Sequence, residues 1–191
     1  MAVARIYKQP NRPYLFDRII QNLQDELGGL SWLDHIFGRA ERLVKMKNGA
    51  RYYTPNVYRG KDDYIQLLPD NMELGNYCFF VLDDPQTISL PMGLQNRVKT
   101  PFSLIVWVDM RQVGATYDDR NTEQLKEQLI KTIRRAWIKK GAVTLAKVYE
   151  KAENVFQGFS LDEVDNQYLM APYAGFRITG EMQIDEECDN S

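Results

Sequence analysis

The sequence predicts an α+β fold: a mostly antiparallel β-sheet with two long helices packed on one face, plus a long extended loop. Three features lead to this prediction. Two segments repeat apolar residues at helical spacing, several short segments alternate apolar with polar residues, and FSLIVWVDM (residues 102–110) is almost entirely apolar. An alternating segment is typical of a strand with one buried face, whereas a continuous apolar run is typical of a strand buried on both faces. We therefore expect residues 102–110 to lie at the centre of a sheet whose uncovered face is polar.

The length and composition favour one domain over residues 1–191. The chain has 191 residues, 44% hydrophobic and 26% charged, which is enough to bury a sizeable core. We expect a protruding loop at residues 83–101 and an acidic, flexible tail at residues 185–191. The formal charge of −2 gives no reason to expect a nucleic-acid or membrane partner. Two cysteines, Cys78 and Cys188, make no disulfide framework, and the chain shows no apolar leader, so we expect free thiols and a cytoplasmic site of assembly.

The two helices are predicted from apolar periodicity and from their ends. The first begins at Pro13 and ends at Gly28, and the second begins with Asn121 and Gln124 as a capping pair and closes at Gly141. Their apolar stripes predict which side chains face the core: Phe16, Ile19, Ile20, Leu23 and Leu27 in the first helix, and Leu125, Leu129, Ile133 and Trp137 in the second.

Asn48-Gly49 predicts a β-hairpin, because both residues tolerate a positive φ angle. Leu43–Lys47 and Arg51–Tyr58 would be its strands. Pro55 lacks a backbone donor, so the second strand should lie at a sheet edge or carry a bulge. Before the hairpin, SWLDHIFGR (31–39) suggests a short helical turn. After it, DYIQLLPDN (63–71) and NYCFFVLDD (76–84) suggest two short extended segments.

In the last third of the chain, one segment fits two kinds of secondary structure. LAKVYEKAENVFQG (145–158) fits a helix, which we favour, but the same residues could form a twisted strand. Ser160 and Glu163 form a capping box that predicts a short helix, which Pro172 would end. A final strand follows, with Phe176, Ile178, Met182 and Ile184 on one face and Arg177, Thr179, Glu181, Gln183 and Asp185 on the other.

The residues show no catalytic or metal-binding signature. His35 is the only histidine and is expected to be a partly buried side chain bonded to a neighbour. Cys78 lies in an apolar strand and Cys188 among acids, and neither environment favours a reactive thiolate. Acidic pairs such as Asp83-Asp84 are more typical of solvated turns than of a cation site. Glycine-rich phosphate motifs are absent from the sequence. We therefore expect no metal and no cofactor.

Two surface features allow a functional or an ordinary interpretation. The basic segment KTIRRAWIKKG could contact DNA through Lys131, Arg134, Arg135, Lys139 and Lys140, but it is more typical of the polar face of a helix. RYYTPNVY holds Tyr52, Tyr53 and Tyr58, which suit a protein interface and equally suit a strand.

Residues 154–184, NVFQGFSLDEVDNQYLMAPYAGFRITGEMQI, resemble the closing segment of bacteriophage tail-completion proteins, a group that includes tail terminators and head–tail connectors. The order of the preceding elements is similar as well. The resemblance implies a structural virion protein rather than an enzyme, assembled in the bacterial host cytoplasm. It implies a homo-oligomeric ring, six-fold or twelve-fold, that contacts other neck, tail or portal proteins and surrounds the path of the genome DNA, without a membrane partner.

On this interpretation the polar face of the last strand meets either the next subunit or the DNA channel, and the loop at residues 83–101 docks on a neighbour. Edge strands and extended loops are natural providers of such contacts. The candidate interface or lumen residues are Arg177, Glu181, Asp185, Tyr52, Tyr53, Tyr58, Arg97 and Lys99.

Overall fold

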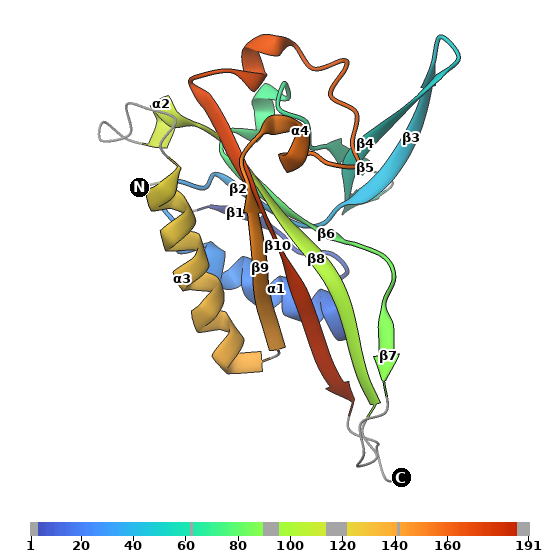
Figure 1. Ribbon diagram of the computed structural model, residues 1–191, viewed down its shortest axis with the longest axis vertical. Helices are drawn as coiled ribbons and strands as arrows, with labels where there is room; N and C mark the ends of the chain where they lie inside the picture. The colour runs from blue at the N-terminus through green and yellow to red at the C-terminus, as the bar shows by residue number, and fades with distance from the viewer. Residues whose placement is uncertain (1–3, 62, 90–95, 114–121, 141, 187–191) are drawn as a thin grey trace.

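The structure is a computed structural model that describes residues 4–61, 63–89, 96–113, 122–140 and 142–186. It has an α+β fold built on a mixed, mostly antiparallel sheet (Figure 1). The strands follow the order β1-β2-β6-β8-β10-β9, and β7 adds to the outer part of β8. The bounds of these strands are Arg5–Tyr7 (β1), His35–Arg39 (β2), Tyr77–Leu82 (β6), Thr87–Ser89 (β7), Asn96–Asp109 (β8), Ala142–Tyr149 (β9) and Tyr173–Glu186 (β10).

The two long helices, α1 (Leu15–Leu27) and α3 (Glu123–Lys140), pack on one face of this sheet and against each other. The predicted stripe of α1 is buried in full, and Gly28 follows its last residue. Leu125, Leu129 and Ile133 bury the corresponding stripe of α3. The predicted cap residue Asn121 and the side chain of Trp137 lie outside the described residues. Both helices are therefore confirmed where the structure describes them, although α1 begins at Leu15 and not at Pro13.

The second face of the main sheet is not polar as expected, because a second hydrophobic core covers it. Phe37, Phe79, Ile105 and Trp107 on this face pack against a smaller sheet and a short helix, α4 (Ala152–Val155). The smaller sheet has the order β3-β4-β5, with bounds Glu41–Lys47, Ala50–Gly60 and Asp63–Gln66. The strand at residues 102–110 is central and buried on both faces, as predicted.

The hairpin at Asn48-Gly49 is confirmed. Both residues have positive φ, 49° and 79°, and the flanking strands β3 and β4 pair in register from Lys47 with Ala50 to Glu41 with Asn56. β4 is the middle strand of its sheet and not an edge strand, but its pairing with β5 carries a bulge or irregularity between Tyr58 and Gly60, the second alternative predicted from Pro55. Pairing with β5 starts only at Asn56, so the missing N–H of Pro55 removes no bond from that ladder.

Two segments expected to be helical are strands. His35–Arg39 forms β2 between β1 and β6, where Phe37 and Trp32 before it are nevertheless buried as expected. In residues 145–158, the first half belongs to β9 and only Ala152–Val155 is helical. The apolar residues of β9 fit the spacing of a helix and that of a strand equally well. The segment is a strand because it pairs along β10.

The capping box at Ser160 opens no helix. Its hydroxyl accepts the backbone N–H of Tyr53 in β4 at 3.0 Å instead, and the short 3₁₀ turn at Asn166–Leu169 is capped by Asp165. β10 begins directly after Pro172, as predicted. Two other short elements are α2 (Met110–Val113) and a 3₁₀ turn at Met72–Leu74.

Within the loop predicted at residues 83–101, residues 87–89 and 96–101 form strands, and residues 90–95 lie outside the described residues. β7 pairs antiparallel with the start of β8, from Thr87 with Lys99 to Ser89 with Arg97. β10 extends to Glu186, so only residues 187–191 of the predicted tail follow the last strand, and these lie outside the described residues.

Candidate assembly surfaces

One end of the main sheet extends beyond the helices as a narrow projection, which we call the long arm: residues 87–89 of β7, 96–101 of β8 and 181–186 of β10 (Figure 1). It exists because β8 and β10 pair along their whole length, from Asp109 with Tyr173 to Asn96 with Glu186. β6 stops pairing at Leu82, opposite Phe102, and β7 replaces it along the rest of β8. The long arm is thus continuous with the core of the sheet.

The polar residues of the long arm are partly paired with each other. Lys99 Nζ lies 2.8 Å from Glu181 Oε1, and both side chains are about one-third to two-fifths exposed. Arg97 is half-buried and interacts within the chain. The side chain of Asp185 lies outside the described residues. The most exposed apolar residue of the arm is Ile88 on β7, at 73%.

Arg177 does not lie on this surface, which corrects the expectation from the sequence. Its side chain is buried on the face of β10 that meets the second core, with 7% exposure. Its Nε donates to Ser103 Oγ at 2.8 Å, its Nη1 donates to the Gln157 carbonyl at 3.0 Å, and its Nη2 lies 3.5 Å from Asp83 Oδ2. Ser103 donates to the same Asp83 oxygen at 2.8 Å. Arg177 therefore joins three strands and the segment after α4, and it is satisfied within the chain.

The β3–β4 hairpin forms a second projection, on a different side of the molecule (Figure 1). We call residues 41–53 the hairpin arm. Val44 and Met46 are exposed at 54% and 64%, although hydrophobic side chains of this size are usually covered. On the same face, the Arg42 guanidinium lies 3.8 Å from the centre of the Tyr53 ring. Among the described residues no strand pairs with the outer edge of β3.

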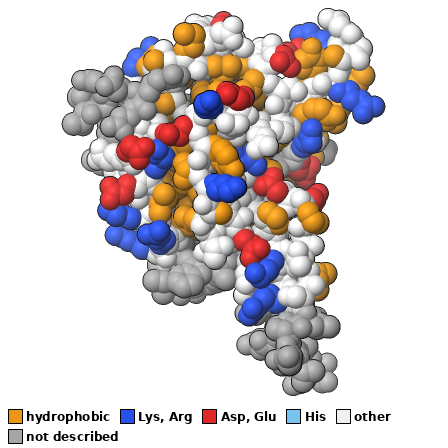
Figure 2. All heavy atoms as spheres, in the orientation of Figure 1, with side chains coloured by type: hydrophobic (Ala, Val, Ile, Leu, Met, Phe, Trp, Pro, Cys, Tyr) orange, Lys and Arg blue, Asp and Glu red, His pale blue; other side chains and the backbone are white. Residues whose placement is uncertain are grey.

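The hairpin arm is strongly basic. It contains four basic residues and one acidic residue, namely Arg42, Lys45, Lys47, Arg51 and Glu41. Figure 2 shows Lys and Arg side chains beside hydrophobic ones over this projection. Lys47 forms a salt bridge with Glu163, and Ser160 bonds to both backbone groups of Tyr53, so the arm is braced against residues 160–163.

The three candidate tyrosines occupy different settings along β4. Tyr52 and Tyr53 are half-buried, and Tyr53 lies under Arg42. Tyr58 stacks at a tilt on Tyr64 of β5, with ring centres 5.1 Å apart. Tyr53 therefore belongs to the exposed side of the hairpin arm, whereas Tyr58 lies toward its base. The hairpin does not bring any of them next to the Lys99–Glu181 pair of the long arm.

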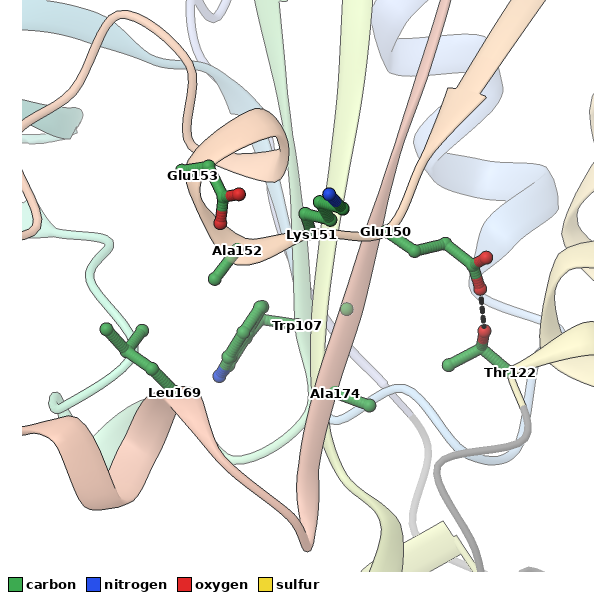
Figure 3. Close-up of a pocket in the computed structure, with 9 residues that line it drawn as sticks. Trp107, Thr122, Glu150, Lys151, Ala152, Glu153, Leu169 and Ala174 are labelled. Atoms are coloured by element: carbon green, nitrogen blue, oxygen red, sulfur yellow. Dashed lines mark hydrogen bonds between the residues drawn. The ribbon is translucent and has the colours of Figure 1, made fainter.

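A groove of about 560 Å³ opens between the start of β10 and α4 (Figure 3). Trp107, Ala152 and Leu169 form an apolar side, and Ala174 lies on the other side of β10 with Glu150, which is bonded to the Thr122 hydroxyl at 2.7 Å. Glu150 also pairs with Lys126 at 2.8 Å, and these partners lower the pKa of the Glu150 carboxyl. The groove thus combines apolar side chains with a charged carboxylate that is already paired within the chain.

The remaining candidate residues occupy ordinary structural positions. His35 is half-buried and donates from Nδ1 to the Leu74 carbonyl at 2.6 Å. Cys78 is fully buried, and burial raises the pKa of its thiol. On α3, Lys131 pairs with Glu127, and Arg134 and Arg135 are exposed. The side chains of Lys139 and Lys140, and all of Cys188, lie outside the described residues.

Within the described ranges, no three His, Cys, Asp or Glu side chains gather as a cation site would need. The same ranges contain no helix with both the length and the apolar character needed to cross a bilayer.

No protein-family model matches the chain. No curated protein matches it either. The geometry of the two arms is therefore what supports a function.

Sequence reasoning missed several of the residues that define these surfaces. It assigned no role to Val44, Met46 or Ile88, because an apolar residue in a strand is ordinarily expected to face a core. A signal was present in RLVKMK, where apolar residues alternate with cations on both faces of a short hairpin. The partnership of Arg177 with Asp83 had no local signal, since the two residues are far apart in the chain.

Proposed function

We propose that this chain is a structural protein of a tailed-bacteriophage virion and forms a ring in the neck or tail, as a tail terminator or head–tail connector. The observation that carries the proposal is the pair of β arms on different sides of a double-core body (Figure 1). A head-to-tail ring uses two different surfaces of each subunit, and the two arms supply such surfaces.

The chemistry of the arms supports a role in assembly. Each arm exposes apolar side chains: Val44 and Met46 on the hairpin arm and Ile88 on the long arm. Each also has a strand edge without a partner among the described residues, on β3 and on β7. Exposed apolar residues beside a free strand edge are typical of surfaces that meet another chain.

In this role the subunits would surround the DNA path in a closed ring of six or twelve copies and contact neighbouring neck, tail or portal proteins. The chain would have a structural role and no catalytic one. The double core gives such a subunit a stiff body, because the main sheet is packed on both faces between α1 and α3 on one side and the smaller sheet on the other.

The proposal is tested by sedimentation velocity and negative-stain electron microscopy of the full chain, from micromolar concentration upward. We expect closed rings of uniform diameter, and an antibody against the chain should label a single level of the neck or tail in phage particles. A monomer at every concentration, together with particles that carry no label, would overturn the proposal.

The same samples test the alternative of a DNA-binding accessory protein that uses the basic face of α3. That alternative requires tight binding to duplex DNA that weakens steeply with salt. A ring subunit is expected to bind DNA weakly at physiological salt, and Arg134→Ala with Arg135→Ala should leave ring formation unchanged. Strong, salt-dependent binding by a monomer would favour the DNA-binding alternative instead.

A further inference from the structure

We propose that the outer edge of β3 binds an extended segment of a neighbouring protein as an added strand, and that this segment has apolar residues in its middle and carboxylates at its ends. The inference goes beyond the proposed function, which names no side chain that would hold a neighbouring protein. It does not depend on whether copies of this chain form a ring.

The outer edge of β3 presents backbone groups that have no partner among the described residues. On β4, Tyr53 accepts from the Ser160 N–H and donates to the Ser160 hydroxyl, so both of its backbone groups point away from β3. Val44 lies directly opposite Tyr53, which makes this a pair that exchanges no hydrogen bonds, and the N–H and C=O of Val44 therefore point to the outer edge. Bonded and non-bonded pairs alternate along an antiparallel ladder, so the same groups of Arg42 and Met46 point outward too.

Pro55 agrees with this register. It lies opposite Arg42, and a residue without an N–H is suited to a pair that exchanges no hydrogen bonds. β3 is also the outer strand of the projecting hairpin, so its edge is open to another chain (Figure 1). An added strand pairs with N–H and C=O groups at every second residue, and the outer edge of β3 offers this pattern.

The residues with outward backbone groups also carry exposed side chains on one face of the hairpin arm. Val44 and Met46 are more than half exposed, and Arg42 is exposed as well. Tyr53 shares this face because it lies opposite Val44, and Arg51 shares it because it lies opposite Met46. An added strand would set its own side chains beside the two aliphatic ones and remove apolar surface from water.

The charge of this face defines the partner. Its two charged side chains, Arg42 and Arg51, are both cationic, and neither forms an ion pair with a described residue. Arg42 lies over the Tyr53 ring, a contact that leaves its positive charge without a carboxylate. Arg42 is at the end of the face nearest the body, and Arg51 is at the end nearest the turn. A segment with carboxylates at both ends of an apolar centre complements this arrangement.

The opposite face of the hairpin arm takes no part in the contact. Lys45 and Lys47 lie there, where Lys45 bonds to Gln66 and Lys47 pairs with Glu163. These bonds hold the arm against the body, so the edge of β3 is presented in a fixed direction and less entropy is lost on binding. The contact leaves this face and the long arm available for contacts between copies.

A second copy is a poor partner for the same edge. Two β3 edges that paired with each other would bring the arginines of both arms together with no carboxylate on that face. Like charges held side by side are unfavourable at an interface, whereas a segment that supplies carboxylates avoids this cost.

The first test measures the binding of designed peptides to the full chain by fluorescence anisotropy. The acidic probe is the capped peptide SETITITES, which places two Glu and two Ile on one face of a strand. It should bind at least about tenfold more tightly than SKTITITKS, in which both Glu are Lys. N-methylation of both Ile keeps the side chains but removes donors that would face β3, and it should also weaken binding at least about tenfold.

A pair of charge-reversed variants tests which face binds. Arg42→Glu should weaken binding of the acidic probe at least about tenfold. Lys45→Glu is the matched control, since it makes the same charge change on the same strand but on the opposite face, and it should weaken binding by less than about threefold. Circular dichroism checks that both variants are folded. Equal weakening by the two variants would overturn the contact, because only long-range attraction would then remain.

Hydrogen exchange, resolved to single residues by mass spectrometry, tests strand addition directly. In the free chain, the amides of Arg42, Val44 and Met46 should exchange quickly, whereas those of Leu43 and Lys45 should be protected by β4. The acidic probe should slow the three fast amides. Binding that leaves them fast would overturn strand addition. Slowing that appears without a probe as the chain is concentrated, or with duplex DNA alone, would assign the edge to another occupant and overturn the proposed partner.

These outcomes are distinct from those of the ring test. If the chain forms rings but the acidic probe binds no better than the basic or methylated peptide, the β3 contact is overturned and the ring stands. If the acidic probe binds and slows the three amides but the chain stays monomeric and unlabelled in phage particles, the ring is overturned and the β3 contact stands.

Discussion

Arg177 on β10 and Asp83 after β6 form an ion pair across β8, with Ser103 of β8 bonded to both. The guanidinium is buried, whereas the carboxylate is partly exposed. Because the pair spans three strands, it fixes the lateral order β6-β8-β10 at the level where the long arm leaves the body. Arg177 therefore stabilises the fold, and any effect of its substitution on assembly is indirect.

Arg177→Ala should lower the free energy of unfolding by about 2–3 kcal/mol, because the Gln157 carbonyl loses its side-chain donor and Asp83 loses its cation, while Ser103 keeps only its bond to Asp83. Urea unfolding followed by circular dichroism measures the change. Arg135→Ala, at an exposed position of α3, is the matched control and should change stability by no more than about 0.5 kcal/mol. Equal stability of the two variants would show that the ion pair contributes nothing.

Gly175→Ala should also destabilise the protein, through steric overlap. A Cβ at Gly175 would lie 2.2 Å from Trp107 Cε3 and 2.5 Å from the Val106 carbonyl oxygen. The strand and the indole would have to move, at a cost of about 1–3 kcal/mol. In Gly29→Ala the new Cβ meets only the Glu26 carbonyl at 3.5 Å, so this control should be nearly neutral. Thermal melts that place both variants at the wild-type midpoint would contradict the prediction.

Asp109 should make the stability depend on pH. Hydrogen bonds from the Arg111 side chain are the main cause of the lowered pKa of its carboxyl, although burial opposes them. The Asp109 carboxyl therefore binds a proton less readily in the folded state than in the unfolded state. The stabilisation that the Asp109 carboxylate gives is complete above the unfolded pKa of about 4, and it is lost as the pH falls through the lower pKa of the folded state.

Comparison with Asp109→Asn tests this prediction. At pH 7 the variant should be less stable than the wild type by about 1 kcal/mol, a modest value because the Arg111 guanidinium is largely exposed. The difference should narrow as the pH falls below about 4. A difference that stays constant from neutral to acidic pH would exclude the Arg111 pair as its cause.

Cys78 should be unreactive in the folded protein. Its thiol is fully buried, and burial raises its pKa, so little thiolate forms at neutral or mildly alkaline pH. In a Cys188→Ser variant, a thiol-specific chromogenic reagent should detect no cysteine until urea unfolds the chain. Rapid labelling of that variant without denaturant would mean that β6 opens readily.

Ile88→Ser alone should leave the fold unchanged, because the side chain is almost fully in solvent, but it should weaken self-association. The free energy of unfolding of the monomer should stay within about 0.5 kcal/mol of the wild type. Sedimentation velocity measures the association. Unchanged association with unchanged stability would show that Ile88 takes no part in self-association.

The parts of the fold that the sequence predicts well are those with local signals. The stripe from Phe16 to Leu27 specifies α1, Asn48-Gly49 specifies a hairpin, and residues 102–110 specify a central strand. Each of these patterns lies within a single helix, turn or strand, so its structure can be predicted without knowing which distant segment packs against it.

The parts that could not be predicted depend on distant pairing. β9 is a strand because β10 lies beside it, although its apolar residues also fit a helix. Ser160 bonds to Tyr53 rather than to its own backbone, so a local capping motif is overridden by tertiary structure. The second core forms because the smaller sheet packs against the second face of the main sheet. No single segment of the sequence indicates this packing.

The continuous pairing of β8 with β10 has a mechanical consequence. The two strands share fourteen paired positions that run from the body into the long arm. Their hydrogen bonds are perpendicular to the strands. A pulling force on the end of the arm therefore loads these bonds together in shear instead of opening them one after another. We expect this ribbon to resist tension along its length much better than force applied across it, a property that single-molecule pulling in the two directions can measure.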